Sequence, residues 1–130
     1  MRFNFTFFIN CFPELIAKMP FTLWLGLISF AASFILAVII AVLRNVKSRP
    51  VRWVIAVYIS FFRSTPYITQ LFIFYYGLPQ LIPRFRTMSA ETSFVISVAL
   101  NSSAFITEII RGGLLSVEKS QREAALSIGM

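Results

Sequence analysis

A polar stripe runs along one face of an apolar stretch in the last third of the chain. In a helix, residues three or four positions apart share a face, so this spacing brings one set of side chains together. The set is Ser93, Ser97, Asn101, Ala104, Glu108 and Arg111. The positions between them are mostly Phe, Val, Ile and Leu. The pattern favours a membrane helix whose polar face lines a site or pathway.

Two kinds of role are open for the polar members of this stripe. Asn101, deep in the stretch, could contact a polar solute or hydrogen-bond a neighbouring helix. Glu108 and Arg111 lie one helical turn apart and could pair with each other. Alternatively, both could belong to the pathway, with Glu108 helping to fix the gate or the connector near its cytoplasmic mouth.

A second polar group interrupts another apolar stretch. Arg63, Ser64, Thr65 and Pro66 stand together and are followed by Gln70. Pro66 removes a backbone donor and disfavours helix just before it, so we expect a kink or a new helix start, with Ser64 or Thr65 as its cap. Arg63 and Gln70 would share a face. Burying an arginine in lipid costs about 2.5–3.5 kcal/mol, so Arg63 should either anchor at the membrane interface or face the pathway.

Catalytic and metal chemistry have few residues to draw on. The chain contains no His and no Asp, and Cys11 is its single cysteine. The commonest general base and the commonest metal ligand are therefore missing. The sequence also lacks a glycine-rich phosphate loop of the Gly-x4-Gly-Lys-Ser/Thr type. We expect no catalytic residue, no metal site and no cofactor, and if ATP drives this protein, another subunit must bind it.

The composition indicates a membrane protein. Of the 130 residues, 58% are hydrophobic, and the mean hydropathy is +0.79. In soluble domains the apolar share is roughly 45–50%. The formal net charge of +7 could suggest a nucleic-acid partner. The basic residues, however, flank the apolar stretches instead of forming one basic face, so they indicate membrane topology and argue against nucleic acid.

Three stretches are long and apolar enough to span a membrane, at residues 20–43, 53–78 and 92–110. The first would be about 36 Å long as a helix, against a hydrocarbon core of about 30 Å. It also carries small residues at helical spacing, which let helices approach closely. These are Thr22, Gly26, Ser29, Ser33, Ala37 and Ala41, with Pro20 as the expected helix start. Residues 1–19 are aromatic and weakly charged, so we expect them outside, along the membrane surface.

The density of basic residues sets the expected orientation. Residues 44–52 are crowded with them: Arg44, Lys47, Arg49 and Arg52. The positive-inside rule makes this loop cytoplasmic, which places the N-terminus outside and residues 111–130 inside. Arg84 and Arg86 would then lie outside. Shortly after them, Ser89 is expected to cap the third helix, with Glu91 in its first turn.

Residues 111–130 have the composition of a water-facing connector. Ser120 is followed three residues later by Glu123, a capping-box pattern that predicts a short helix starting near Ser120. Ala124 and Ala125 would give this helix a smooth surface. Such a helix could dock into a groove of another protein or rest on its own chain.

These stretches resemble a known family. Glu108-Ile-Ile-Arg-Gly-Gly113, followed by Gln121-Arg-Glu-Ala-Ala-Leu-Ser-Ile-Gly129, is similar to the cytoplasmic EAA loop of bacterial ABC-importer permeases, in particular their polar amino-acid uptake branch. Arg63-Ser-Thr-Pro66, followed by Gln70-Leu-Phe-Ile-Phe-Tyr-Tyr-Gly-Leu-Pro79, resembles the second signature of that branch. Ser64 stands where this signature usually has glycine. The resemblance covers about residues 20–130, with both signatures in the family's order.

The resemblance implies an all-α membrane protein: three transmembrane helices plus a short cytoplasmic coupling helix, forming the N-terminal part of a longer permease bundle in the bacterial cytoplasmic membrane. It implies three protein partners: an ATP-binding subunit, a second permease subunit in a homo- or heterodimer, and an extracytoplasmic solute-binding protein. The residues implied in ATPase coupling are Ser120, Glu123, Ala124, Ala125 and Gly129. The residues assigned to the pathway are Arg63, Thr65, Pro66, Gln70, Asn101, Glu108 and Arg111.

By the same resemblance, the solute would be a polar amino acid. The segment Tyr75-Tyr-Gly-Leu-Pro-Gln80 is similar to cystine- or glutamine-type permeases, and no residue identifies the solute further. ATP would be hydrolysed on the partner subunit, so this chain would transport and not catalyse. The alternative is a membrane scaffold that transports nothing, or a truncated remnant of such a permease.

Overall fold

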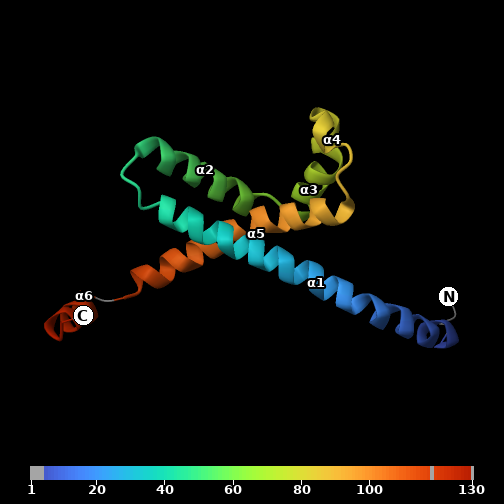
Figure 1. The fold of residues 1–130 in the computed structure, drawn as a ribbon, viewed down its shortest axis with the longest axis horizontal. Helices are drawn as coiled ribbons and strands as arrows, with labels where there is room; N and C mark the ends of the chain where they lie inside the picture. The colour runs from blue at the N-terminus through green and yellow to red at the C-terminus, as the bar shows by residue number, and fades with distance from the viewer. Residues whose placement is uncertain (1–4, 118, 130) are drawn as a thin grey trace.

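The structure is a computed structural model that describes residues 5–117 and 119–129. In this part of the chain every regular element is a helix, and Figure 1 shows two long helices crossing, with α6 beyond the end of α5. The helices are α1 (Phe5–Leu43), α2 (Arg49–Ser64), α3 (Tyr67–Phe72), a π-helical stretch (Ile73–Gly77), α4 (Leu78–Leu81), a 3-10 turn (Pro83–Phe85), α5 (Ala90–Leu115) and α6 (Lys119–Ser127). The all-α class predicted from the sequence is therefore confirmed.

α1 begins at Phe5 and continues for 39 residues. The predicted helix start at Pro20 is therefore wrong, because Pro13 and Pro20 both lie inside the helix. Each proline removes its own backbone donor and crowds the carbonyl four residues earlier, whereas unwinding the helix would leave several backbone groups without partners. The two prolines are two helical turns apart and share one side of α1. A surface location for residues 1–19 stays a prediction.

α1 and α5 cross where both carry small residues (Figure 1). Ser29, Ser33 and Ala37 on α1 are at most 1% exposed. On α5, the buried Thr107 hydroxyl donates to the Ala37 carbonyl at 3.3 Å. Short side chains let the two backbones come within reach of such bonds. The predicted packing stripe is thus confirmed from Ser29 to Ala37, while its first two members are exposed.

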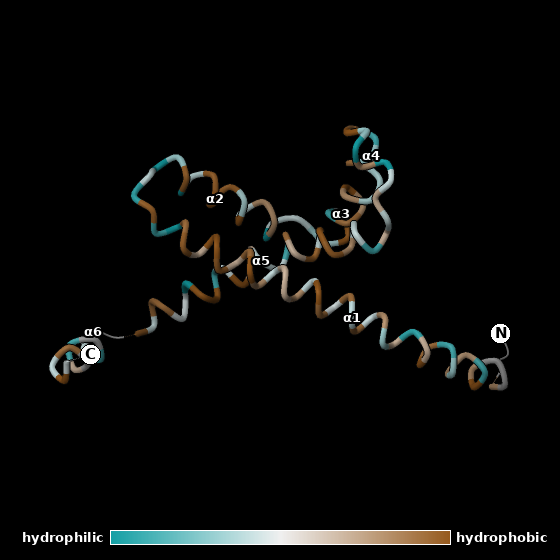
Figure 2. Tube along the Cα trace, in the orientation of Figure 1, coloured by the Kyte–Doolittle hydropathy of each residue, from teal (hydrophilic) through white to brown (hydrophobic). Residues whose placement is uncertain are grey.

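The distribution of polarity is the reverse of that in a water-soluble protein. Large apolar side chains on α1 are exposed, with Leu23 at 67% and Phe30 at 61%, and Figure 2 shows brown along much of α1. The buried polar residues are Ser29, Ser33, Gln70, Ser93, Ser97, Ser103 and Thr107. In lipid, apolar side chains gain nothing by turning inward, whereas polar groups must find partners inside the protein. The exterior of this bundle therefore suits a lipid environment.

Among the residues that the structure describes, two helices are long and apolar enough to cross a membrane, over Phe8–Leu43 and Ala90–Leu115. The stretch predicted as the middle span, residues 53–78, is instead divided among several helices. α2 ends and α3 turns away from its line at Thr65 and Pro66 (Figure 1). The predicted break is confirmed, but no single helix of spanning length covers this stretch. A third span is therefore a proposal.

α5 begins where the sequence indicates and ends later. The Ser89 hydroxyl accepts a hydrogen bond from the Thr92 backbone N–H at 3.2 Å, so the predicted cap is confirmed. At the other end the helix passes through the glycine pair to Leu115. Each glycine costs only about 1 kcal/mol relative to alanine, and the Ser116 hydroxyl donates to the Gly113 carbonyl at 2.7 Å. The connector predicted for this region therefore begins as a further turn of helix.

Because α1 and α5 pack closely where they cross, a larger side chain should destabilise the protein at a buried position of α1 and not at an exposed one. Replacing the fully buried Ala37 by Leu should force the helices apart and destabilise the protein by about 1–3 kcal/mol. Ala31 lies on the same helix but is exposed, so Ala31→Leu is the matched control, with an expected change below about 0.5 kcal/mol. Detergent-induced unfolding followed by circular dichroism measures both variants. Equal losses would contradict close packing at Ala37.

Candidate functional site

The break between α2 and α3 leaves the backbone carbonyl of Phe62 without its helical partner. In an α-helix a carbonyl accepts from the N–H four positions later. For Phe62 that position is Pro66, which has no N–H. Two side-chain amides take its place, because Gln70 Nε2 and Asn101 Nδ2 each donate to the Phe62 carbonyl at 3.1 Å. Side chains from α3 and α5 therefore supply the hydrogen bonds that the Phe62 carbonyl loses at the break. The sequence alone identifies this carbonyl, because it lies four residues before Pro66.

We refer to Phe62, Thr65, Gln70 and Asn101 as the amide cluster. Gln70 is 1% exposed, and its Oε1 accepts from Asn101 Nδ2 at 3.1 Å. Gln70 Nε2 also contacts the carbonyl oxygen of Thr65 at 3.2 Å and its hydroxyl. Such a connected network holds α3 against α5. The structure thus brings together candidate residues from both polar groups, and for Asn101 the hydrogen bond between helices is present.

Ser64 and Thr65 do not cap α3, so that prediction is wrong. Ser64 Oγ donates to the Ser60 carbonyl at 2.7 Å, and Thr65 Oγ1 donates to the Phe61 carbonyl at 2.9 Å. Both residues still belong to the end of α2, where hydroxyls readily bond the carbonyl four residues earlier. α3 instead has Pro66 at its N-cap, with no side-chain cap.

Arg63 and Gln70 do not share a face, contrary to the prediction from their spacing. The backbone leaves helical geometry at Thr65, so the interval between them no longer corresponds to two regular turns. Gln70 is buried, whereas Arg63 is exposed at the end of α2. The Arg63 guanidinium lies over the ring of Phe105 on α5, 5.7 Å from the ring centre. A role for Arg63 in the pathway stays a prediction.

Two tyrosines add polar contacts along α5. The Tyr58 hydroxyl donates to the Leu100 carbonyl at 2.7 Å and lies 2.7 Å from Ser103 Oγ. The Tyr67 hydroxyl lies 3.3 Å from Ser97 Oγ. Tyr67 directly follows Pro66 in the second polar group, whereas Tyr58 stands among mostly apolar residues. The sequence does not show which residues these tyrosines contact, because each meets its partner only after the helices pack. Ser103 therefore contacts a tyrosine of α2, before the break, and Ser97 contacts a tyrosine of α3, after it.

Glu108 joins two arginines from different parts of the chain. Its carboxylate contacts the Arg44 guanidinium just after α1 and accepts from Arg111 Nε at 3.1 Å within α5. The predicted pairing of Glu108 with Arg111 is confirmed. Arg44 was predicted only as a topology signal, and its contact with Glu108 emerges from the packing. The Arg44 side chain is 29% exposed against 50% for Arg111, so the contact between α1 and α5 is the more shielded.

α6 stands clear of the other helices beyond the end of α5 (Figure 1). It begins one residue before Ser120, so the predicted helix is confirmed, but Ser120 lies inside it and is not its cap. Glu123 and Ala124 are exposed, and the side chain of Ala125 lies outside the described part of the structure. Gly129 follows the helix with φ +82°, a left-handed conformation that favours glycine. The candidate coupling residues therefore lie on or just after a projecting helix.

The candidate residues supply hydrogen-bond donors and acceptors and charged groups. Every buried side-chain nitrogen and oxygen in the described part of the chain has a hydrogen-bond partner. Among those residues, no three His, Cys, Asp or Glu side chains lie together as metal ligands. The amide cluster and Glu108 hold α2, α3 and α5 and the end of α1 together.

The amide of Gln70 should matter because Pro66 lacks an N–H, and a double-mutant cycle tests this dependence. Gln70→Leu removes one of the two donors to the Phe62 carbonyl and should destabilise the protein by about 1–3 kcal/mol. Pro66→Ala returns a backbone N–H to that carbonyl. In the Pro66→Ala background, Gln70→Leu should therefore cost about 1 kcal/mol less. Detergent-induced unfolding measures all four proteins.

Gln80 provides the matched control for this cycle. It is an exposed glutamine on α4, so Gln80→Leu removes an amide of the same size away from the break. We expect a change below about 0.5 kcal/mol in either background. If the effects of Gln70→Leu and Pro66→Ala were simply additive, the amide would not be replacing the missing N–H.

Comparisons with known proteins agree with this architecture. The family model described as binding-protein-dependent transport system inner membrane component matches residues 33–130. The chain is 39% identical over 127 residues to the probable amino-acid permease protein YxeN of Bacillus subtilis, covering 98% of this chain and 57% of that protein. It is 44% identical over 119 residues to the L-cystine transport system permease protein TcyB of the same species, covering 91% of this chain and 49% of that protein.

A solved structure has the same fold. The crystal structure of an amino acid ABC transporter with histidines matches with a TM-score of 0.86 at 33% identity, covering 100% of this chain and 59% of that chain. The chain spans about half the length of the curated relatives it matches. The resemblance to ABC-importer permeases inferred from the two signatures is confirmed. The family model matches most of the chain, and the helices have the fold of the solved transporter. The chain therefore belongs to the family of binding-protein-dependent transport system inner membrane components.

Proposed function

We propose that this chain is the membrane-spanning permease part of an ATP-binding-cassette importer for polar amino acids. The observation that carries the proposal is the exposed helix α6, which bears the signature from Gln121 to Gly129 just beyond the long apolar α5. The family match supports it, as do relatives named as amino-acid permeases. In this proposal the chain moves the solute, and a partner subunit binds and hydrolyses ATP.

The proposed topology has three spans in the bacterial cytoplasmic membrane, at residues 20–43, 53–78 and 92–110. The middle span would be the broken one, crossing as α2 followed by the segment from α3 to α4. The amide cluster supports this, because lipid requires every backbone polar group at a break to find a partner within the protein. Residues 44–52 and 111–130 would be cytoplasmic, and the N-terminus would be outside.

Coupling to ATP would run through α5. The helix α6 would dock into a groove of the ATP-binding subunit, and movement of α6 would pass directly to α5. Side-chain contacts of α5 would pass the movement to α1 and α2, because Glu108 contacts Arg44 just after α1 and Asn101 donates to the Phe62 carbonyl near the end of α2. The proposed docking residues are Ser120, Glu123, Ala124, Ala125 and Gly129. A second permease subunit would complete the pathway, and an extracytoplasmic solute-binding protein would deliver the solute.

The amide cluster is the proposed contact for the solute. A zwitterionic amino acid needs hydrogen-bond partners for both ends, and amides can supply donors and acceptors. Gln70 and Asn101 already bond each other, so contact with the solute would require them to exchange partners. The remaining pathway residues in this proposal are Arg63, Thr65, Pro66, Glu108 and Arg111. The similarity to an L-cystine permease supports a cystine- or glutamine-type solute.

A charge reversal on α6 tests the proposed coupling. Glu123→Arg would place a like-charged or unpaired group in the docking groove, which costs several kcal/mol when the groove is desolvated. We expect recovery of the ATP-binding subunit in co-purification to fall at least tenfold, together with ATP-dependent amino-acid uptake in proteoliposomes.

Gln121→Arg is the control for this test. Gln121 is exposed on the same helix, and a separation of two residues places it on roughly the opposite side from Glu123. Association and uptake should be unchanged in this variant. If Glu123→Arg leaves association intact, the coupling assignment fails. If the unaltered protein binds the ATPase and yet moves no amino acid, the scaffold alternative replaces transport.

The proposed topology predicts which positions an impermeant thiol reagent can reach. In a Cys11→Ser background, single cysteines replace Lys47, Arg86 or Gln121, one protein at a time. Arg86→Cys should be labelled in intact cells, because the loop before α5 would lie outside. Lys47→Cys and Gln121→Cys should be labelled only after the membrane is permeabilised. Labelling of Gln121→Cys in intact cells would exclude contact of α6 with a cytoplasmic ATPase.

A further inference from the structure

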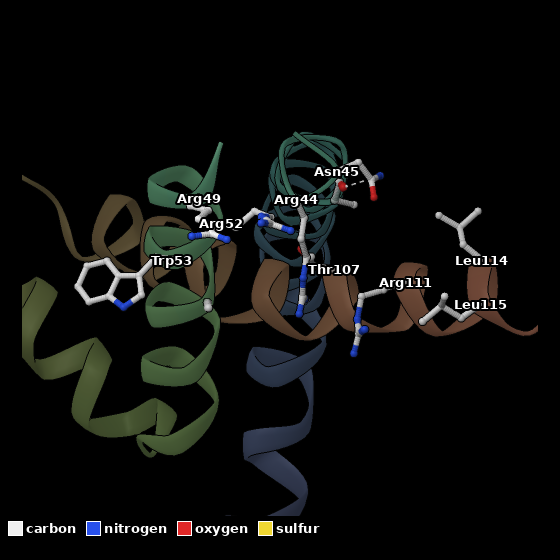
Figure 3. Close-up of a pocket in the computed structure, with 11 residues that line it drawn as sticks. Arg44, Asn45, Arg49, Arg52, Trp53, Thr107, Arg111, Leu114 and Leu115 are labelled. Atoms are coloured by element: carbon white, nitrogen blue, oxygen red, sulfur yellow. Dashed lines mark hydrogen bonds between the residues drawn. The ribbon is translucent and has the colours of Figure 1, made fainter. Parts of the chain in front are cut away.

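A hollow lies at the end of α1 and the start of α2, and it shares Arg44 and Arg111 with the contacts of Glu108. Its volume is about 590 Å³, and its lining comes from α1, α2 and α5 together with the turn between α1 and α2 (Figure 3). The basic residues that line it are Arg44, Arg49, Arg52 and Arg111. The larger apolar residues that line it are Trp53, Leu114 and Leu115. Figure 3 shows Trp53 on one side of the arginines and Leu114 and Leu115 on the other, so apolar side chains border the positive charge on two sides.

The positive charge of this hollow is only partly balanced. Glu108 contacts both Arg44 and Arg111, and one carboxylate cannot neutralise two guanidinium groups. Within the part of the chain that the structure describes, neither Arg49 nor Arg52 forms an ion pair. The hollow therefore attracts an anion.

The start of α2 adds to this attraction. Arg49 and Arg52 lie in its first turn, where the helix dipole is positive and acidic residues are favoured. That turn contains no acidic residue, and Ser48 at the N-cap makes no side-chain cap hydrogen bond. Pro50 has no N–H and the Arg52 N–H donates to the Ser48 carbonyl at 3.3 Å, so the N–H groups of Arg49 and Val51 remain at this helix end beside the two cations. A bound anion would satisfy both.

We infer that the hollow binds the headgroup of an anionic phospholipid. The phosphate lies among the arginines, whose guanidinium groups can bind phosphate oxygens in pairs. The acyl chains lie along the exposed apolar side chains on either side of the arginines, Trp53 at 69% exposed on one side and Leu114 and Leu115 at 67% and 70% on the other. Basic pockets between membrane helices favour such headgroups. A free phosphate ion would use the arginines and leave these apolar side chains uncovered, so their exposure favours a lipid as the source of the phosphate.

Counting bound lipids on the purified transporter assembly tests this inference. The assembly is titrated separately with phosphatidylglycerol, with phosphatidylcholine and with inorganic phosphate, and native mass spectrometry measures what stays bound. Phosphatidylglycerol should bind at least tenfold more tightly than phosphatidylcholine. Replacing both Arg49→Gln and Arg52→Gln should weaken phosphatidylglycerol at least tenfold, since each basic residue near an anionic lipid contributes several-fold to affinity.

The matched control removes the same charge elsewhere. Arg84→Gln with Arg86→Gln alters two exposed arginines in the segment before α5 and should change the affinity for phosphatidylglycerol less than twofold. Equal losses in the two double variants would mean attraction by overall charge and would overturn the site. Saturation by inorganic phosphate alone would overturn the lipid as ligand.

A photo-reactive residue in place of Trp53 separates a lipid from a protein occupant. Cross-linking to phosphatidylglycerol supports the inference, and cross-linking to a protein segment overturns it. None of these measurements depends on ATPase binding or uptake. Failure of the lipid site is therefore distinguishable from failure of the proposed transport function.

Discussion

A backbone carbonyl that has lost its helical donor must find another donor inside the protein, and this requirement governs the middle of the bundle. Water can solvate such a group in a soluble protein, but lipid cannot. At Phe62 the loss comes from Pro66, and the replacement donors are Gln70 and Asn101. Because these amides come from α3 and α5, one repair fixes three helices relative to one another. The break is thereby a defined joint between α2 and α3.

The same requirement explains why small polar residues lie inside and large apolar ones outside. Lipid is as apolar as a protein core, so helices in lipid associate through close packing and hydrogen bonds. Ser33 and Ala37 on α1 leave room for the Thr107 hydroxyl of α5 to reach a backbone carbonyl. At the far end of the crossing, Glu108 holds Arg44. The positions of α1 and α5 are therefore fixed by short side chains and by a charged contact.

The features that rest on local rules can be predicted from the amino-acid sequence. The helical class, the packing stripe from Ser29 to Ala37 and the cap at Ser89 follow from spacing within a few turns. The helix break at Pro66 is predicted because proline has no N–H. The family is predicted from two signatures, each of which is a continuous run of residues. A short helix near Ser120 also follows from local residues. Each of these needs only neighbours along the chain, which is why the sequence was sufficient.

Which distant groups meet depends on how the helices pack. Asn101 reaches Gln70 across 31 residues of sequence, and Arg44 reaches Glu108 across 64. Helical periodicity lists the residues on a face, but it does not say which face of another helix lies opposite. It also failed where the backbone departs from a regular helix, as in the predicted shared face of Arg63 and Gln70 across the break. The physical reason is that local propensity fixes elements, whereas partners are chosen by the packing of whole helices.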